Sequence, residues 1–150
     1  MFKVGIIGFG KIGQLRARLV EAHPDLQLDS ISDIVDNRND QYSRIPLFSE
    51  YQDVLSRNPD IIFVCCLNDM LAEATIAALD SGCHVFSEKP PGRTVEEVKA
   101  IIAAEKRNPD CKLKFGFNHR YHDSVRDALQ IMNKGELGKV INLRGVYGKS

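Results

Sequence analysis

The stretch Gly8-Phe9-Gly10-Lys11-Ile12-Gly13 decides the fold, because of the segments on either side of it. It follows Phe2–Ile7, an apolar run typical of a buried parallel strand. After it, apolar residues recur at the spacing of one helical face, namely Ile12, Leu15, Leu19 and Val20. The next apolar run ends in Asp33, about 20 residues beyond the last glycine. This context predicts a strand, a tight glycine turn and a helix, the start of a βαβ unit that binds a dinucleotide.

Each glycine of the stretch has a separate predicted task. Gly8 permits the tight turn from strand to helix, Gly10 lets a pyrophosphate approach the backbone, and Gly13 lets the helix pack closely on the strand. We expect the whole quoted stretch to hold the phosphates, on free N–H groups at the helix N-terminus. The alternative is a glycine-rich turn without a ligand, which leaves the position of the following acid unexplained.

The acid and the polar loop after it indicate which dinucleotide is bound. Asp33 is expected to accept hydrogen bonds from both hydroxyls of the adenosine ribose. A 2′-phosphate there would face a carboxylate, so NAD is the predicted cofactor and NADP is less favoured. Arg38 lies close enough to Asp33 in sequence to cover the adenine or to reach a 2′-phosphate, which weakens that preference. The rest of the loop, residues 36–40, is expected to be solvated.

Composition and charge restrict the class of protein. The chain has 150 residues with 20 basic and 20 acidic side chains, which predicts no general attraction to nucleic acid or to a membrane surface. No apolar run is long enough to span a bilayer. The cysteines lack a Cys-x-x-Cys spacing, so we expect a reduced, cytoplasmic protein. His119, His122 and Asp123 are imperfectly spaced for ligands, so we expect no bound metal.

Strand and helix patterns alternate along most of the chain. They predict strands near residues 3–7, 26–32, 46–48, 61–66, 84–86 and 112–117, and helices near residues 12–22, 51–57, 71–80 and 95–106. Strands that are apolar throughout, such as residues 61–66, indicate coverage on both faces. Alternating βαβ units with right-handed crossovers predict an α/β protein with a doubly wound parallel sheet, the Rossmann fold, over residues 1–120.

The pattern changes towards the C-terminus. Residues 122–134 are predicted to form a helix that ends at Gly135, and residues 139–147 to form a strand. A helix and one strand cannot bury their own apolar surfaces as a separate domain. We therefore expect residues 121–150 either to dock on the nucleotide domain or to begin a C-terminal α/β domain that is otherwise absent.

A second motif, Ser87-Glu88-Lys89-Pro90-Pro91-Gly92, follows the strand predicted near residues 84–86. The carboxyl ends of parallel strands form the edge where open α/β sheets bind ligands. A lysine there can donate to a substrate oxygen and stabilise charge during transfer of a proton or hydride. We expect the Lys89-Pro90 bond to be cis, because tight turns keep such bonds. The motif alone is equally consistent with a polar turn and an exposed lysine.

Together these motifs resemble a known family. The glycine stretch, Glu88-Lys89-Pro90, residues 117–121 (Phe-Asn-His-Arg-Tyr) and residues 134–140 (Lys-Gly-Glu-Leu-Gly-Lys-Val) recur in the order and at the distances found in the Gfo/Idh/MocA family. This family is named after glucose–fructose oxidoreductase, inositol dehydrogenase and a rhizopine-catabolism protein, and the resemblance covers essentially all of the chain. It implies a two-domain, NAD(P)-dependent oxidoreductase that acts on sugars, cyclitols and related polyols.

The resemblance also implies roles for single residues. Lys89 would be the active-site lysine that touches the substrate hydroxyl. The residues along the nicotinamide half of the cofactor and in the same cleft would be Leu67, Asn68, Glu88, Asn118 and Arg120.

The chain departs from the family pattern in two places. Leu67 and Leu71 occupy the proline and histidine places of the family's Thr-Pro-Asn-x-x-His stretch. The chain also stops in what resembles the first strand of the family's C-terminal sheet, which provides most of the substrate pocket and an acid or base that pairs with the lysine. We therefore expect NAD binding without turnover by this chain alone, and a possible homodimer through the strand at residues 140–147. A non-enzymatic NAD-binding sensor or partner subunit is the alternative function.

Overall fold

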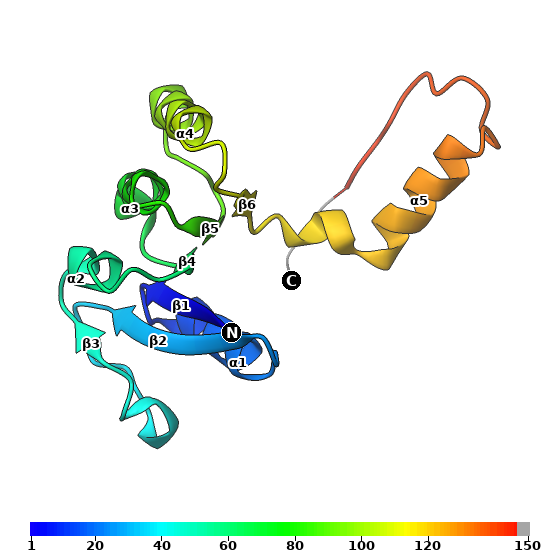
Figure 1. Ribbon diagram of the computed structural model, residues 1–150. Coiled ribbons are helices and arrows are strands. Elements are labelled where there is room, and N and C mark those ends of the chain that lie inside the picture. The colour runs from blue at the N-terminus through cyan, green and yellow to red at the C-terminus, as the bar shows by residue number, and fades with distance from the viewer. Residues whose placement is uncertain (147–150) are drawn as a thin grey trace. The chain divides into compact units, whose positions relative to one another are not determined.

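A computed structural model describes residues 1–146 of the chain. The chain divides into two compact units, Met1–Gly116 and Phe117–Ser150, and each is described by itself. In Figure 1 the first unit runs from blue to yellow-green and the second from yellow to red. The predicted end of the nucleotide domain, residue 120, lies slightly beyond this division. That the second unit begins a separate domain stays a prediction.

The first unit is built on one parallel sheet (Figure 1). Its six strands lie in the order β3-β2-β1-β4-β5-β6, and each pairs in parallel with its neighbours. Their bounds are β1 Phe2–Ile7, β2 Leu26–Ser32, β3 Leu47–Phe48, β4 Ile61–Val64, β5 His84–Ser87 and β6 Leu113–Phe115. This topology confirms the predicted doubly wound sheet, and it places the switch in strand order between β1 and β4.

Helices cover both faces of the sheet. Successive side chains of a strand point to opposite faces, so apolar strands leave apolar surface on both sides that must be buried. On one face Ala17 and Val20 pack against Val4 and Ile6 in the first of two apolar cores, and these helical residues belong to α1 (Lys11–Glu21). The second core contains Val64 and lies on the other face. That face is covered by α2 (Tyr51–Leu55), α3 (Asn68–Asp80) and α4 (Val95–Arg107). The sheet is therefore enclosed, as its apolar strands predict.

The buried face of α1 differs from the predicted one. Three of the four residues expected to face the sheet are exposed: Ile12, Leu15 and Leu19. The buried residues of this helix are Gly13, Ala17 and Val20. The cause is the short distance between helix and strand, because a Cβ on Gly13 would overlap the carbonyl oxygen of Gly8. Only a glycine fits at this contact, so the helix turns its small side towards β1 and its larger apolar side chains away from it.

The second unit contains η2 (Asn118–Tyr121) and α5 (Asp123–Asn133), close to the predicted helix at residues 122–134. The strand predicted at residues 139–147 is wrong for the part that the structure describes, because residues 139–146 form neither helix nor strand. Tyr147 lies outside the described residues. A strand is stabilised by hydrogen bonds to a neighbouring strand. The described part of this unit has no other strand with which the segment could pair.

Candidate functional site

The ends of β1, β2 and β4 meet around one pocket at the carboxyl edge of the sheet, with a volume of about 320 Å³. The glycine turn, the loop after β2 and the segment after β4 all contribute to its wall. Among the lining residues are Gly8, Gly10, Asp33, Val35, Leu67 and Met70. The pocket therefore lies at the switch in strand order, where open α/β sheets bind their ligands.

The three glycines of the turn meet different surroundings. Gly8 has a φ of +89°, and a Cβ there would lie 2.5 Å from the backbone nitrogen of Cys66. A side chain at Gly13 would overlap the Gly8 carbonyl, as described above. Gly10, in contrast, has no atom within 4 Å of its Cβ position, and it lines the pocket. Gly8 and Gly13 are thus required by the fold, whereas Gly10 leaves open space at the N-terminus of α1.

Asp33 is fixed at the pocket wall by the backbone on either side of it. One carboxylate oxygen accepts a hydrogen bond from Phe9 N at 2.6 Å, and the other accepts one from Val35 N at 3.0 Å. The Phe9 side chain is buried, and its ring packs edge-on against Tyr42 with 5.3 Å between centroids. Each oxygen of Asp33 keeps a further lone pair, so the carboxylate can also accept hydrogen bonds from a ligand's hydroxyl groups.

For Lys11 and Ile12, the predicted role in holding the phosphates stays a prediction. Lys11 and Ile12 form the first turn of α1, and their side chains are exposed. Neither is among the residues that line the pocket in the described structure.

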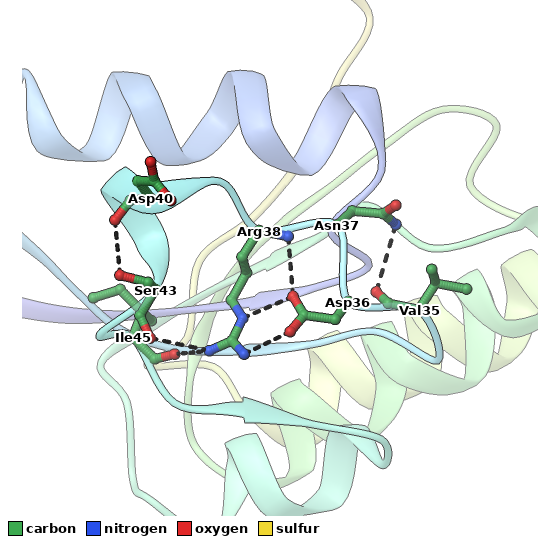
Figure 2. A network of polar contacts seen from close by, with 7 residues as sticks. All are labelled: Val35, Asp36, Asn37, Arg38, Asp40, Ser43 and Ile45. Atoms are coloured by element: carbon green, nitrogen blue, oxygen red, sulfur yellow. Dashed lines mark hydrogen bonds and ion pairs between the residues drawn. The ribbon is translucent and has the colours of Figure 1, made fainter.

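Arg38 is not among the residues that line the pocket, and Figure 2 shows its guanidinium group directed to Asp36 and Ile45 instead. Its Nε and Nη2 donate to the two carboxylate oxygens of Asp36 at 2.9 and 2.7 Å, and its Nη1 donates to the carbonyl of Ile45 at 2.7 Å. The hydrogen bonds that Asp36 accepts from the side chain and the backbone N–H of Arg38 lower its pKa to about 2. An adenine or phosphate contact by Arg38 stays a prediction, and it requires this arrangement to open.

Several residues that line the pocket are not among those predicted from the sequence, although the sequence contains a signal for some of them. Ile34 and Val35 directly follow Asp33, and they extend the apolar run of β2 into the pocket wall. Met70 comes from α3, one turn after Leu67, and Tyr51 comes from α2. These apolar surfaces suit a flat aromatic ring such as adenine. Of the two residues expected after β4, Leu67 lines the pocket beside Asp33, and Asn68, at the start of α3, does not.

The surroundings of Tyr51, Cys65 and Cys66, which line the pocket, favour the neutral forms of these three side chains. Tyr51 donates its hydroxyl proton to Glu73 at 2.7 Å, and burial together with this carboxylate raises its pKa to about 12. Burial also raises the pKa of Cys65 to about 12 and that of Cys66 to about 11. Because the thiolate is the reactive form of cysteine, the two thiols act as small apolar groups.

Glu88 and Lys89 follow β5 at the same edge of the sheet. The Glu88 N–H donates to the carbonyl of Val64 at 2.9 Å, so the turn continues directly from the β4–β5 pairing. The Lys89-Pro90 bond is cis, which confirms that prediction. The Glu88 carboxylate forms an ion pair with Arg16 of α1. A Cβ on Gly116 would lie 2.8 Å from its other oxygen, so Glu88 is confined between α1 and the end of β6.

Asn118 and Arg120 belong to η2 of the second unit. Their predicted place in the cleft stays a prediction. Among residues 1–146, no three histidine, cysteine, aspartate or glutamate side chains are grouped as metal ligands would be. In the same residues, no helix is both long enough and apolar enough to cross a membrane.

Comparison with known proteins identifies the family. The family model for Gfo/Idh/MocA, described as "Oxidoreductase family, NAD-binding Rossmann fold", matches residues 2–117, which is most of the chain. The chain belongs to the Gfo/Idh/MocA family. The matched residues of this Gfo/Idh/MocA chain end one residue past the first structural unit, so the family's cofactor domain coincides with the parallel sheet.

Relatives of this Gfo/Idh/MocA chain include inositol dehydrogenases. It is 28% identical to inositol 2-dehydrogenase of Salmonella typhimurium, with 95% of this chain and 45% of that protein covered. The crystal structure of myo-inositol 2-dehydrogenase from Lactobacillus plantarum is 31% identical, with a TM-score of 0.84 over 93% of this chain and 43% of that one. Scyllo-inositol dehydrogenase from Lactobacillus casei, solved with NAD(H) and scyllo-inositol, is 26% identical, with a TM-score of 0.84 over 92% of this chain and 42% of that one. The chain thus spans less than half the length of these relatives.

Proposed function

We propose that the complete protein transfers a hydride between NAD and a secondary alcohol of a cyclitol, sugar or related polyol, and that this chain forms its cofactor-binding part. The observation that carries the proposal is the pocket, which joins the glycine turn to Asp33, with Lys89 after a strand at the same edge. The relatives are named as dehydrogenases of inositols, which supports this class of alcohol.

The pocket residues fit a dinucleotide. Open space at Gly10 lets a pyrophosphate reach the N–H groups and the positive end of α1. The Asp33 carboxylate, already oriented by two N–H groups, accepts hydrogen bonds from the ribose hydroxyls. Ile34 and Met70 offer apolar surface to the adenine. When NAD is bound, its nicotinamide ring accepts or returns the hydride.

Lys89 is the residue of this chain that we assign to the reacting alcohol. Its ammonium group would donate a hydrogen bond to the substrate oxygen and stabilise the negative charge that develops there as the proton leaves. A basic group from another part of the complete protein would take that proton. Asn68, Glu88, Asn118 and Arg120 are proposed to border the nicotinamide side of the same site.

The proposal includes a cytoplasmic location and association of two copies. The four cysteines are free thiols in the structure, a state that a reducing compartment maintains. Ile141 and Leu143 are 93% and 77% exposed in a segment that forms no strand. Pairing with the same segment of a second copy would satisfy its backbone groups and cover these side chains.

Calorimetric titration of this chain with NAD and with NADP tests the cofactor assignment. We expect NAD to bind more tightly, and we expect Asp33→Ala to narrow the difference by removing both the ribose contacts and the repulsion of a 2′-phosphate. Asp110→Ala, at an exposed position before β6, is the matched control and should bind both cofactors as the parent chain does. Equal or tighter binding of NADP by the parent chain would contradict the assignment.

A further inference from the structure

The loop after β2 divides its side chains between the pocket and the outer surface. Asp33, Val35 and Asn37 line the pocket, but the intervening Asp36 and the following Arg38 do not. Figure 2 shows the guanidinium group of Arg38 between the Asp36 carboxylate and the backbone near Ile45. Arg38 therefore follows a pocket residue in sequence, but hydrogen bonds within its own loop hold its guanidinium group at Asp36 and Ile45.

The hydrogen bonds of Arg38 use the edge of the guanidinium that normally binds phosphate. Nε and Nη2 each donate a hydrogen bond to the Asp36 carboxylate, at 2.9 and 2.7 Å. Arginine binds two phosphate oxygens with the same two-point geometry. The Arg38 backbone N–H donates to the same carboxylate at 3.0 Å. The arginine side chain is 21% exposed. A phosphate would therefore have to displace the Asp36 carboxylate from the guanidinium group. Because Asp36 is only two residues from Arg38 in the same chain, its effective concentration at that group is high.

We propose that Asp36 is a determinant of cofactor specificity, which favours NAD over NADP by holding the Arg38 guanidinium away from the adenosine ribose. The inference rests on the proposed binding of a dinucleotide in the Asp33 pocket. Asp33 disfavours a 2′-phosphate by repulsion, and Asp36 removes the nearby cation that could compensate for it. The preference for NAD over NADP then has two sources: Asp33 repels the 2′-phosphate, and Asp36 keeps Arg38 from attracting it.

Calorimetry on four variants of the chain tests the inference, with NAD and NADP as the titrants. Asp36→Ala should lower the Kd for NADP about tenfold, the effect of about one charge-assisted hydrogen bond, and leave the Kd for NAD almost unchanged. Asp36→Ala/Arg38→Ala should lose this gain, because the released guanidinium is what binds the phosphate. Asp40→Ala is the matched control, since it removes the same charge from the same loop without touching the Arg38 guanidinium, and it should show no gain (Figure 2).

Asp36→Asn covers the case in which Asp36→Ala disturbs the loop, because it keeps an acceptor for the Arg38 backbone N–H and removes the charge. An unchanged Kd for NADP in Asp36→Asn, with normal NAD binding by the parent chain, would overturn the inference and leave the proposed function standing. The same gain in Asp40→Ala, or a gain that survives in the double variant, would also overturn it. A parent chain that binds neither cofactor would overturn the proposed function together with the inference.

Discussion

At the scale of single residues, glycines that look alike in the sequence have opposite duties. Gly13 is required by the fold, because any side chain there would meet the carbonyl oxygen of Gly8. Gly10 is not required by the fold, because its Cβ position is empty and its φ of −69° is open to any residue, and in the proposed function it leaves room for the pyrophosphate. The same substitution at the two positions should therefore affect different properties of the molecule.

Gly13→Ala and Gly10→Ala test this separation. We expect Gly13→Ala to lower the free energy of unfolding by about 3 kcal/mol, because backbone rather than a flexible side chain must move. Gly10→Ala should keep the stability of the parent chain and weaken NAD binding, because its methyl group enters the pocket. Urea denaturation and NAD calorimetry measure the two effects. Loss of stability at Gly10 with unaltered NAD binding would contradict the assignment.

Lys89→Ala tests the proposed role of the lysine. We expect NAD binding to be nearly unchanged, because the phosphate and ribose contacts are elsewhere. In the complete protein kcat should fall about a hundred- to a thousandfold, because the substrate oxygen loses its charged donor. Lys99→Ala, at an exposed position on α4, is the control. A complete Lys89→Ala enzyme with ordinary turnover would show that another group polarises the alcohol.

Residue spacing predicted the positions of those candidate site residues that contact the backbone. Gly8, Gly13 and Asp33 are recognisable because the strand–turn–helix geometry sets their distances, whatever the side chains nearby. Arg38 could not be placed in the same way. Its position depends on a side-chain pair with Asp36 and on a carbonyl of the next loop, and spacing alone carries no information on either.

At the scale of secondary-structure elements, the pairing of Arg16 with Glu88 joins α1 to the end of β5. Arg16 Nε donates to Glu88 at 3.0 Å, and its guanidinium carbon lies 4.6 Å from the centre of the Phe86 ring. The two charged side chains are 20% and 14% exposed. The turn that carries Lys89 is therefore anchored to the same helix that begins at the glycine turn, so the two motifs are held in one framework.

Arg16→Ala should break this connection. We expect a loss of about 2 kcal/mol in the free energy of unfolding, because the Glu88 carboxylate stays mostly buried without a partner. The matched control is Arg93→Ala, which removes a more exposed ion pair between the segment before α4 and Glu97 of that helix, and it should cost much less stability. Urea denaturation of both variants gives the comparison. Equal losses would show that the Arg16–Glu88 pair behaves as an ordinary surface ion pair.

Element existence was predictable from the sequence, and element orientation was less so. Period and stop signals located all six strands and the four helices of the sheet, because each has its own local pattern. The prediction of which face of α1 points inward was wrong. The closest contact of that helix with the strand side is made by Gly13 rather than by its large apolar residues. The strand at residues 139–147 was predicted from composition alone, but a strand also needs a neighbour, and composition does not reveal one.

At the scale of the whole molecule, the chain should bind NAD and yet show no measurable oxidation of a polyol. In the proposed function the base that pairs with Lys89 comes from another part of the complete protein, so this chain alone would neither position the substrate fully nor remove its proton. We expect no formation of NADH from NAD and myo-inositol, measured by absorbance, under conditions in which calorimetry shows bound NAD. Turnover at an ordinary enzymatic rate would contradict the proposed division of roles between this chain and the complete protein.

The proposed association of two copies through residues 139–146 can be tested on the same sample. Light scattering after size exclusion should give a dimer for this chain and a monomer for a version that ends at Gly138, because only the longer chain keeps the exposed Ile141 and Leu143. If both versions are monomers, the proposed pairing of two copies through this segment is wrong.

The central position of β1 has a consequence for the synthesis of this protein. β1 leaves the ribosome before both of its neighbours in the sheet, β2 and the much later β4. Until residue 64 has emerged, the edge of β1 that will pair with β4 is an unpaired, apolar strand edge on a nascent chain. A strand from the centre of the finished sheet is therefore the one that waits longest for its partner while the chain is being made.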